Sequence, residues 1–155
     1  MRTLTFLWRD DTSLALKLAA GIEGLYLRTA AHGAPISVTL WQEGSGLEIR
    51  SNMHDLGPRF EIGVLEFLPV QRIFSSDTQI DIPKSFKEHL RVGKLVITEL
   101  DVTAESGITL ENSRGEQIVI VAGSNPYTLS IRGTSFGAEF QPEYPLDRYQ
   151  RVLMA

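Results

Sequence analysis

The chain has 155 residues, of which 43% are hydrophobic and 22% charged, a composition typical of a soluble globular protein. Its formal net charge of −4 offers no basic surface for a nucleic-acid backbone or an anionic membrane, so we expect neither as a partner. Cysteine is absent, which excludes disulfides, thiolate chemistry and cysteine-based metal centres. No segment has the length of a membrane span. We expect a cytoplasmic protein, although a cysteine-free periplasmic protein would have a similar composition.

Apolar and polar residues alternate with a period of two through the first half of the chain, which is the pattern of half-buried strands. The pattern predicts strands over 3–8, 24–29, 36–42, 46–51 and 59–67. Residues 43–45 predict a hairpin connection, and Gly57-Pro58 predicts a break before the strand over 59–67. Residues 13–20 fit either a strand or a short helix, because their leucines satisfy both periods.

The second half of the chain reads as a meander that follows one short helix. Pro83 at a first helical position, with good helix formers after it, predicts a helix over 83–92. Strands are predicted over 94–102, 107–112, 116–122 and 127–132, with turns at 104–106, 113–115 and 123–126. The expected fold is therefore mainly β: an antiparallel β-sandwich or distorted barrel with one or two short helices.

The chain length fits a single β-rich domain over 1–155. An alternative is two packed β halves, about 1–70 and 93–155, joined by the segment that carries the helix at 83–92. A weak internal similarity between residues 41–52 and 103–113, each containing Ser-Gly before a short strand, raises the question of duplication. Convergent turn chemistry explains the same similarity.

The acidic and imidazole side chains most typical of a functional site in this sequence are those of His54 and Asp55, followed by Glu61 and Glu66. The Gly57-Pro58 break predicts that His54 and Asp55 lie in a connection. In a regular strand, Glu61 and Glu66 point to opposite faces. A bulge at Gly63 would put both on the outer face, but too far apart to share one metal ion. We therefore expect no metal site and keep His54 and Asp55 as candidate binding residues.

The sequence contains no convincing catalytic motif. Residues 133–137 match G-x-S-x-G, but no histidine follows Ser135 and the next residues read as extended, so we reject a hydrolase. Glycine-rich phosphate-binding loops are also absent. We expect a protein that is not an enzyme and that needs no cofactor.

The C-terminal segment, residues 140–152, combines two prolines with large apolar side chains. The prolines favour an extended segment, and the apolar area must pack on the same domain or on another chain. We favour packing on the same domain, where the segment would cover a sheet edge or the open end of the sandwich and border a binding surface. Tyr144, Arg148 and Tyr149 are the candidate binding residues of this segment.

The leading functional hypothesis is a non-enzymatic protein–protein interaction module whose partner is another protein or a second copy of the chain. The alternative is a β-sandwich or barrel that binds a small molecule or carbohydrate, using Trp8, Trp41 and nearby polar groups. A catalytic role for His54 ranks third. A deep pocket would favour the ligand binder, and a flat apolar patch would favour the partner binder.

Overall fold

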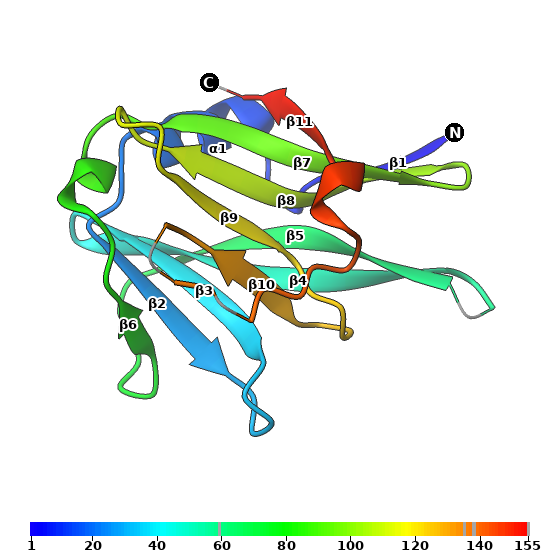
Figure 1. Cartoon of the computed structure of the whole chain (residues 1–155), viewed down its shortest axis with the longest axis horizontal. Coiled ribbons are helices and arrows are strands. Elements are labelled where there is room, and N and C mark those ends of the chain that lie inside the picture. The colour runs from blue at the N-terminus through cyan, green and yellow to red at the C-terminus, as the bar shows by residue number, and fades with distance from the viewer. Residues whose placement is uncertain (59, 135, 138, 155) are drawn as a thin grey trace.

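The computed structural model describes residues 1–58, 60–134, 136–137 and 139–154. In this part of the chain, two mainly antiparallel sheets pack face to face as a β-sandwich, with one α-helix beside the first sheet (Figure 1). The predicted fold class is confirmed, and the sheets do not close into a barrel within the described ranges. None of the described helices is long and apolar enough to cross a membrane.

The first sheet, sheet 1, has the strand order β10-β9-β8-β7-β11, and β1 runs parallel to the start of β8. Its strands are β1 (Arg2–Leu4), β7 (Arg91–Glu99), β8 (Val102–Glu111), β9 (Gln117–Ala122), β10 (Leu129–Arg132) and β11 (Gln150–Leu153).

The second sheet, sheet 2, has the order β5-β4-β3-β2-β6. Its strands are β2 (Gly24–Thr29), β3 (Pro35–Gln42), β4 (Ser45–Gly57), β5 (Phe60–Val70) and β6 (Thr78–Ile80). The helical elements are α1 (Asp11–Ala19) and the 3-10 turns η1 (Lys84–Lys87) and η2 (Leu146–Arg148).

Both faces of sheet 1 are covered by other parts of the chain. On β9, Ile118 and Ile120 belong to the core between the sheets, whereas Val119 and Val121 belong to a second apolar cluster. Alternate residues of a strand point to opposite faces, so this second cluster lies on the outer face of sheet 1. Tyr149 of the C-terminal segment and Ile62 and Val64 of β5 are part of this cluster, so both parts of the chain contribute to the cover.

The C-terminal segment packs on its own chain, as predicted. Its last strand, β11, pairs antiparallel with β7 and so covers that edge of sheet 1. Phe140, Tyr144 and Leu146 pack against the outer apolar cluster. The segment is therefore part of the fold rather than a loose tail.

The N-terminal strand joins the two sheets along one side of the sandwich. β1 pairs with β8 of sheet 1, and Leu7 then forms a parallel bridge with Glu66 of β5 in sheet 2. Only Arg2–Leu4 is a strand, so the prediction of a continuous strand over 3–8 is corrected. The interruption has a physical reason: the backbone N–H of Phe6 donates to the Glu105 carboxylate instead of to a neighbouring strand.

The helical predictions are partly confirmed. The ambiguous segment 13–20 lies mainly in α1, which the Asp10 side chain caps by accepting from the Ser13 N–H. The helix predicted over 83–92 is wrong beyond its first turn: only η1 forms, and Glu88 is already extended. Strand pairing overrides the helix propensity there, because Arg91 and the residues after it pair with β8.

The turn predicted at 104–106 is also wrong. β7 and β8 instead turn at Leu100-Asp101, where Leu100 takes a positive φ of 55°. Residues 104–106 lie inside β8, where Glu105 is buried beside the Lys94 ammonium. The Ser106 hydroxyl donates to the Gly63 carbonyl and so ties β8 to β5.

The strands of 1–70 lie in sheet 2 apart from β1, and those of 93–155 lie in sheet 1, to which β7 also belongs from Arg91; β6, from the segment between the two halves, joins sheet 2. The core between the sheets draws buried residues from both, including Leu40 and Ile49 from sheet 2 and Ile108 and Ile120 from sheet 1. The two similar Ser-Gly segments occupy different structural positions: Ser45 begins β4 after a hairpin turn, whereas Ser106 lies in the middle of β8.

Candidate functional site

His54 and Asp55 lie in a strand, so their expected place in a connection is wrong. β4 continues to Gly57 and pairs with β5 in the order His54–Ile62 and Asp55–Glu61. The His54 ring is half-buried, and within the described residues its Nε2 atom is buried without a hydrogen-bond partner. The His54 ring therefore contributes more to the packing of this hairpin than to an exposed site.

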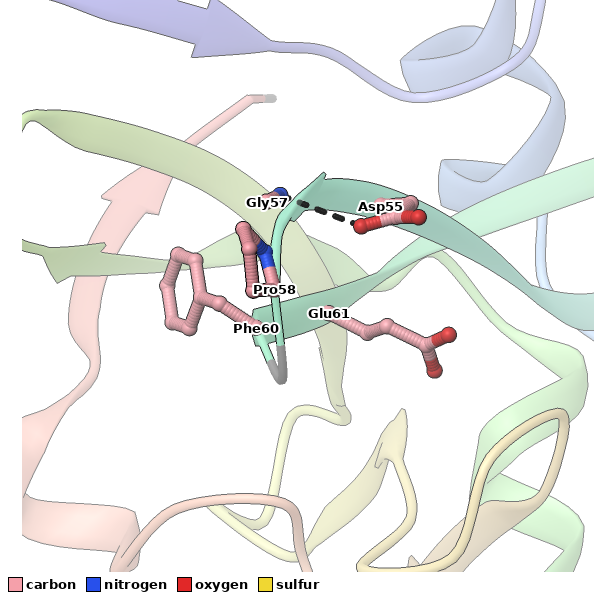
Figure 2. Close-up of a pocket in the computed structure, with 5 residues that line it drawn as sticks. All are labelled: Asp55, Gly57, Pro58, Phe60 and Glu61. Atoms are coloured by element: carbon pink, nitrogen blue, oxygen red, sulfur yellow. Dashed lines mark hydrogen bonds between the residues drawn. The ribbon is translucent and has the colours of Figure 1, made fainter.

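The end of the β4–β5 hairpin forms a pocket of about 700 Å³ (Figure 2). Asp55 Oδ1 accepts a hydrogen bond of 3.0 Å from the Gly57 N–H, which fixes the carboxylate as part of the turn. The side chains of Phe60 and Glu61 point to opposite sides of the strand. All of the described lining residues come from this one hairpin, so a ligand there would have a single wall.

β5 has no bulge at Gly63, because its register with β4 is unbroken from Gly46–Val70 to Asp55–Glu61. Glu61 and Glu66 therefore lie on opposite faces of a regular strand, which is the first of the two registers considered from the sequence. Among the described residues, no three His, Asp or Glu side chains are placed to hold a metal ion.

Gly63 has a packing role instead of a conformational one. A Cβ atom at this position would lie 2.6 Å from the Ala122 Cβ and 2.8 Å from the Ser51 Oγ. Because glycine has no side chain, β5 of sheet 2 can approach β9 of sheet 1 closely at this point.

Tyr144, Arg148 and Tyr149 form one cluster in the C-terminal segment. The two rings meet edge to face with centroids 6.4 Å apart, and the Tyr144 N–H donates to the Tyr149 hydroxyl. The Arg148 guanidinium lies over the Tyr144 ring and donates to Glu99 at 2.9 Å. Burial raises the pKa of Tyr144 to about 12 and also raises the pKa of Tyr149. These contacts anchor the segment on sheet 1.

Glu143 is a second anchor of the C-terminal segment, and the sequence did not single it out. Its carboxylate accepts from the Gly63 N–H at 3.2 and 3.3 Å, so it occupies the unpaired edge of β5. Burial raises the pKa of the Glu143 carboxyl to about 7; the Gly63 hydrogen bond opposes this rise and the charge of Glu61 adds to it. No described hydrogen bond or ion pair joins this segment to His54 or Asp55. The five predicted site residues thus form two separate groups.

A cleft of about 610 Å³ lies on the side of the sandwich where β10 of sheet 1 faces β2 and β6 of sheet 2. We call it the edge cleft. Its described lining residues are Leu27, Thr29, His32, Gly33, Ala34, Pro35, Ile80, Ser124, Asn125, Thr128, Leu129, Ser130, Ile131, Phe136, Gly137, Glu139 and Gln141. Unlike the hairpin pocket, it has walls from both sheets and from the segment that follows β10.

The floor of the edge cleft is apolar and continuous with the core between the sheets. Leu129 and Ile131 of β10 belong to that core, and Leu27, Ile80 and Phe136 pack against it. The Phe136 ring also covers Gly133, where a Cβ atom would lie 2.4 Å from the ring. Contacts with the core on one side and with Gly133 on the other therefore fix the Phe136 ring in the floor of the cleft.

The rim of the edge cleft is polar and is fixed by the backbone of the segment 139–141. The Gln141 N–H donates to the Ser130 hydroxyl at 2.7 Å, and the Gln141 carbonyl accepts from the Ser124 N–H. Within the described residues, no protein hydrogen bond occupies the side chains of Asn125, Glu139 or Gln141. These side chains remain available to a ligand.

Neither tryptophan is among the described lining residues of the edge cleft. The Trp8 indole N–H donates to the Ser13 hydroxyl at 3.0 Å. Trp41 is half-buried on the outer face of sheet 2, opposite the buried Leu40, and its ring lies against Gly46. The aromatic side chain among the described lining residues is that of Phe136.

Comparisons of the chain with protein-family models, with curated proteins and with solved structures find no match. The function is therefore inferred from the geometry of the molecule itself.

Proposed function

We propose that the protein is a non-catalytic binding protein that holds a small ligand in the edge cleft. The observation that carries the proposal is the cleft itself: about 610 Å³ between the two sheets, with an apolar floor and a polar rim. Ligand sites typically enclose about 300–1,000 Å³ and combine apolar walls with a few polar groups. The hairpin pocket at Asp55 lacks this combination of two walls.

The chemistry of the lining supports binding over catalysis. His32 and Glu139 are the ionisable side chains among the described lining residues, and no described hydrogen bond or ion pair joins them. The His32 Nδ1 accepts from the Ala34 N–H, which leaves its Nε2 side for solvent or a ligand. A catalytic site requires an acid, base or nucleophile oriented by a neighbouring group, and this lining offers no such pair.

A blocking variant tests the proposal. Thr29 is exposed at the mouth of the cleft, so Thr29→Trp should fill the cleft without disturbing the core. Amide NMR spectra of the ¹⁵N-labelled protein would be recorded with a library of small neutral and charged compounds. We expect binders to shift resonances in 27–35 and 124–141 together, and Thr29→Trp to abolish these shifts.

The matched control is Thr12→Trp, at an exposed position of α1. It should bind as the unmodified protein does. Binding that survives in Thr29→Trp, or a library without any compound that shifts the two wall segments, would contradict the proposal.

A second candidate function is docking of a protein partner on β11, the hypothesis that the sequence favoured. Its support is that all four residues of this edge strand are exposed, including Val152 and Leu153. Exposed edge strands present unpaired backbone groups to another chain. Leu153→Lys should then lower the native mass of any complex or homo-oligomer measured at high protein concentration, and an unchanged mass distribution would count against this role.

A further inference from the structure

We infer that the ligand of the edge cleft is a neutral, hydroxyl-rich molecule with one apolar face, of the size of a mono- or disaccharide. The inference rests on the proposed function and names the chemical class of its ligand. Three properties of the described lining carry it: the absence of lysine and arginine, the kind of polar groups, and the aromatic side chain in the floor.

The described lining contains no lysine or arginine. Phosphates and carboxylates are recognised by such cations, often through paired hydrogen bonds from a guanidinium. Arg132, which follows Ile131 of the cleft floor, stacks on the Phe140 ring at 4.8 Å and is not among the lining residues. The one carboxylate of the lining, Glu139, would repel an anion. An anionic ligand is therefore disfavoured.

The polar side chains of the described lining are two amides, several hydroxyls, the His32 imidazole and one carboxylate. Amide side chains both donate and accept, and a carboxylate accepts, so Asn125, Gln141 and Glu139 together match groups that do both. Sugar hydroxyls are such groups. The backbone contacts of Gln141 with Ser130 and Ser124 hold this part of the rim in place while its side chain remains without a described partner.

The floor supplies an apolar surface for the C–H face of a ring. Phe136 is half-buried, and its position is set by Gly133 on one side and by the core on the other. Stacking an aliphatic ring face on an aromatic side chain removes apolar area from water and adds dispersion contacts. A ligand that is polar at its edge and apolar on one face satisfies both the rim and the floor.

The test is an amide NMR titration of the full chain with defined probes. The sugars are glucose, galactose, N-acetylglucosamine, maltose and lactose; the comparison probes are inorganic phosphate and octanoate. We expect at least one sugar to shift resonances in 27–35 and 124–141 at millimolar concentration, and inorganic phosphate to leave them unchanged.

Side-chain variants separate specific recognition from weak surface contact. Gln141→Ala removes the amide but keeps the backbone hydrogen bonds of this residue, so the fold should persist while the dissociation constant of the sugar rises about five- to tenfold. Glu139→Ala should weaken binding similarly. The matched control is Gln71→Ala, an exposed glutamine outside the cleft, which should bind unchanged.

The outcomes distinguish the ligand class from the proposed function. If phosphate or octanoate binds in the cleft and no sugar does, the ligand class is wrong while the binding function stands. If no probe shifts the two wall segments and the small-molecule library also fails, both are wrong. A sugar that binds equally to Gln141→Ala and Glu139→Ala would overturn the assignment of the recognising side chains and with it the inference.

Discussion

Replacing Glu143 by glutamine should change how the stability of the protein depends on pH. The pKa of the Glu143 carboxyl rises from its ordinary value of 4.5 to about 7 in the folded protein, mainly because the group is buried. Between these two pH values the folded state holds a proton that the unfolded chain has lost. The free energy of unfolding therefore falls as the pH rises through this window, and it stays at the lower value above about pH 7.

The size of the change in the free energy of unfolding follows from the pKa shift of Glu143. A difference of 7 minus 4.5, at about 1.36 kcal/mol per pKa unit, sets an upper limit of about 3.4 kcal/mol. Solvent screens a half-buried carboxylate, so we expect about 1–2 kcal/mol. Glutamine keeps an oxygen that accepts from the Gly63 N–H but carries no charge. Glu143→Gln should therefore be more stable than the unmodified protein by this amount at about pH 8, and nearly equal to it at about pH 4.

Urea denaturation at several pH values measures the effect directly. In a chain of this length, about 1–2 kcal/mol corresponds to a rise in melting temperature of about 2–8 °C. Glu88→Gln, which neutralises an exposed carboxylate outside the C-terminal segment, is the control and should keep the original pH dependence. If Glu143→Gln retains the full decline of stability between about pH 4.5 and 7, burial of Glu143 is not its source.

Three further predictions concern the packing of the two sheets. Gly63→Ala should lower the free energy of unfolding by about 1–3 kcal/mol, because the added methyl group overpacks against Ala122. Adding Ala122→Gly should restore part of the lost stability. Additive effects of the two substitutions in the double variant would contradict the close approach of β5 to β9. Glu105→Ala should cost about 1–3 kcal/mol in chemical denaturation, because Lys94 then keeps only the more exposed Asp11 carboxylate as a partner and the Phe6 N–H loses its acceptor; a loss below about 0.5 kcal/mol would refute this. Deleting 140–155 should expose the outer face of sheet 1 and cause aggregation or a loss of several kcal/mol, whereas an unchanged melting temperature would show that the segment is dispensable.

The parts of the fold that could be predicted are those with a local signal. β2 forms over the predicted residues 24–29, because its alternation is regular and flanked by turns. The turn at Leu100-Asp101 had no such signal, since leucine rarely takes a positive φ. The residues at 104–106 resembled a turn in composition but lie inside β8.

The candidate site was less predictable, because no local pattern defines the edge cleft. Its described walls come from residues within 27–35, from Ile80, and from residues within 124–134, 136–137 and 139–141, which only the pairing of the strands brings together. The sequence singled out His54 and Asp55 for their side-chain chemistry, but β4 extends beyond its predicted end at residue 51, up to Gly57, and includes both residues in a hairpin. Tyr144, Arg148 and Tyr149 were predicted as binding residues, and the contacts that the structure shows for them anchor the C-terminal segment on sheet 1.

The central claim is that a ligand binds between the two sheets, and intermolecular nuclear Overhauser effects test it most directly. The protein would be methyl-labelled and saturated with the tightest ligand from the titrations. The account predicts contacts from one ligand to methyl groups of both sheets, namely Leu27 of β2 together with Leu129 and Ile131 of β10. Contacts confined to one sheet, or contacts to Leu153 on β11 alone, would contradict it.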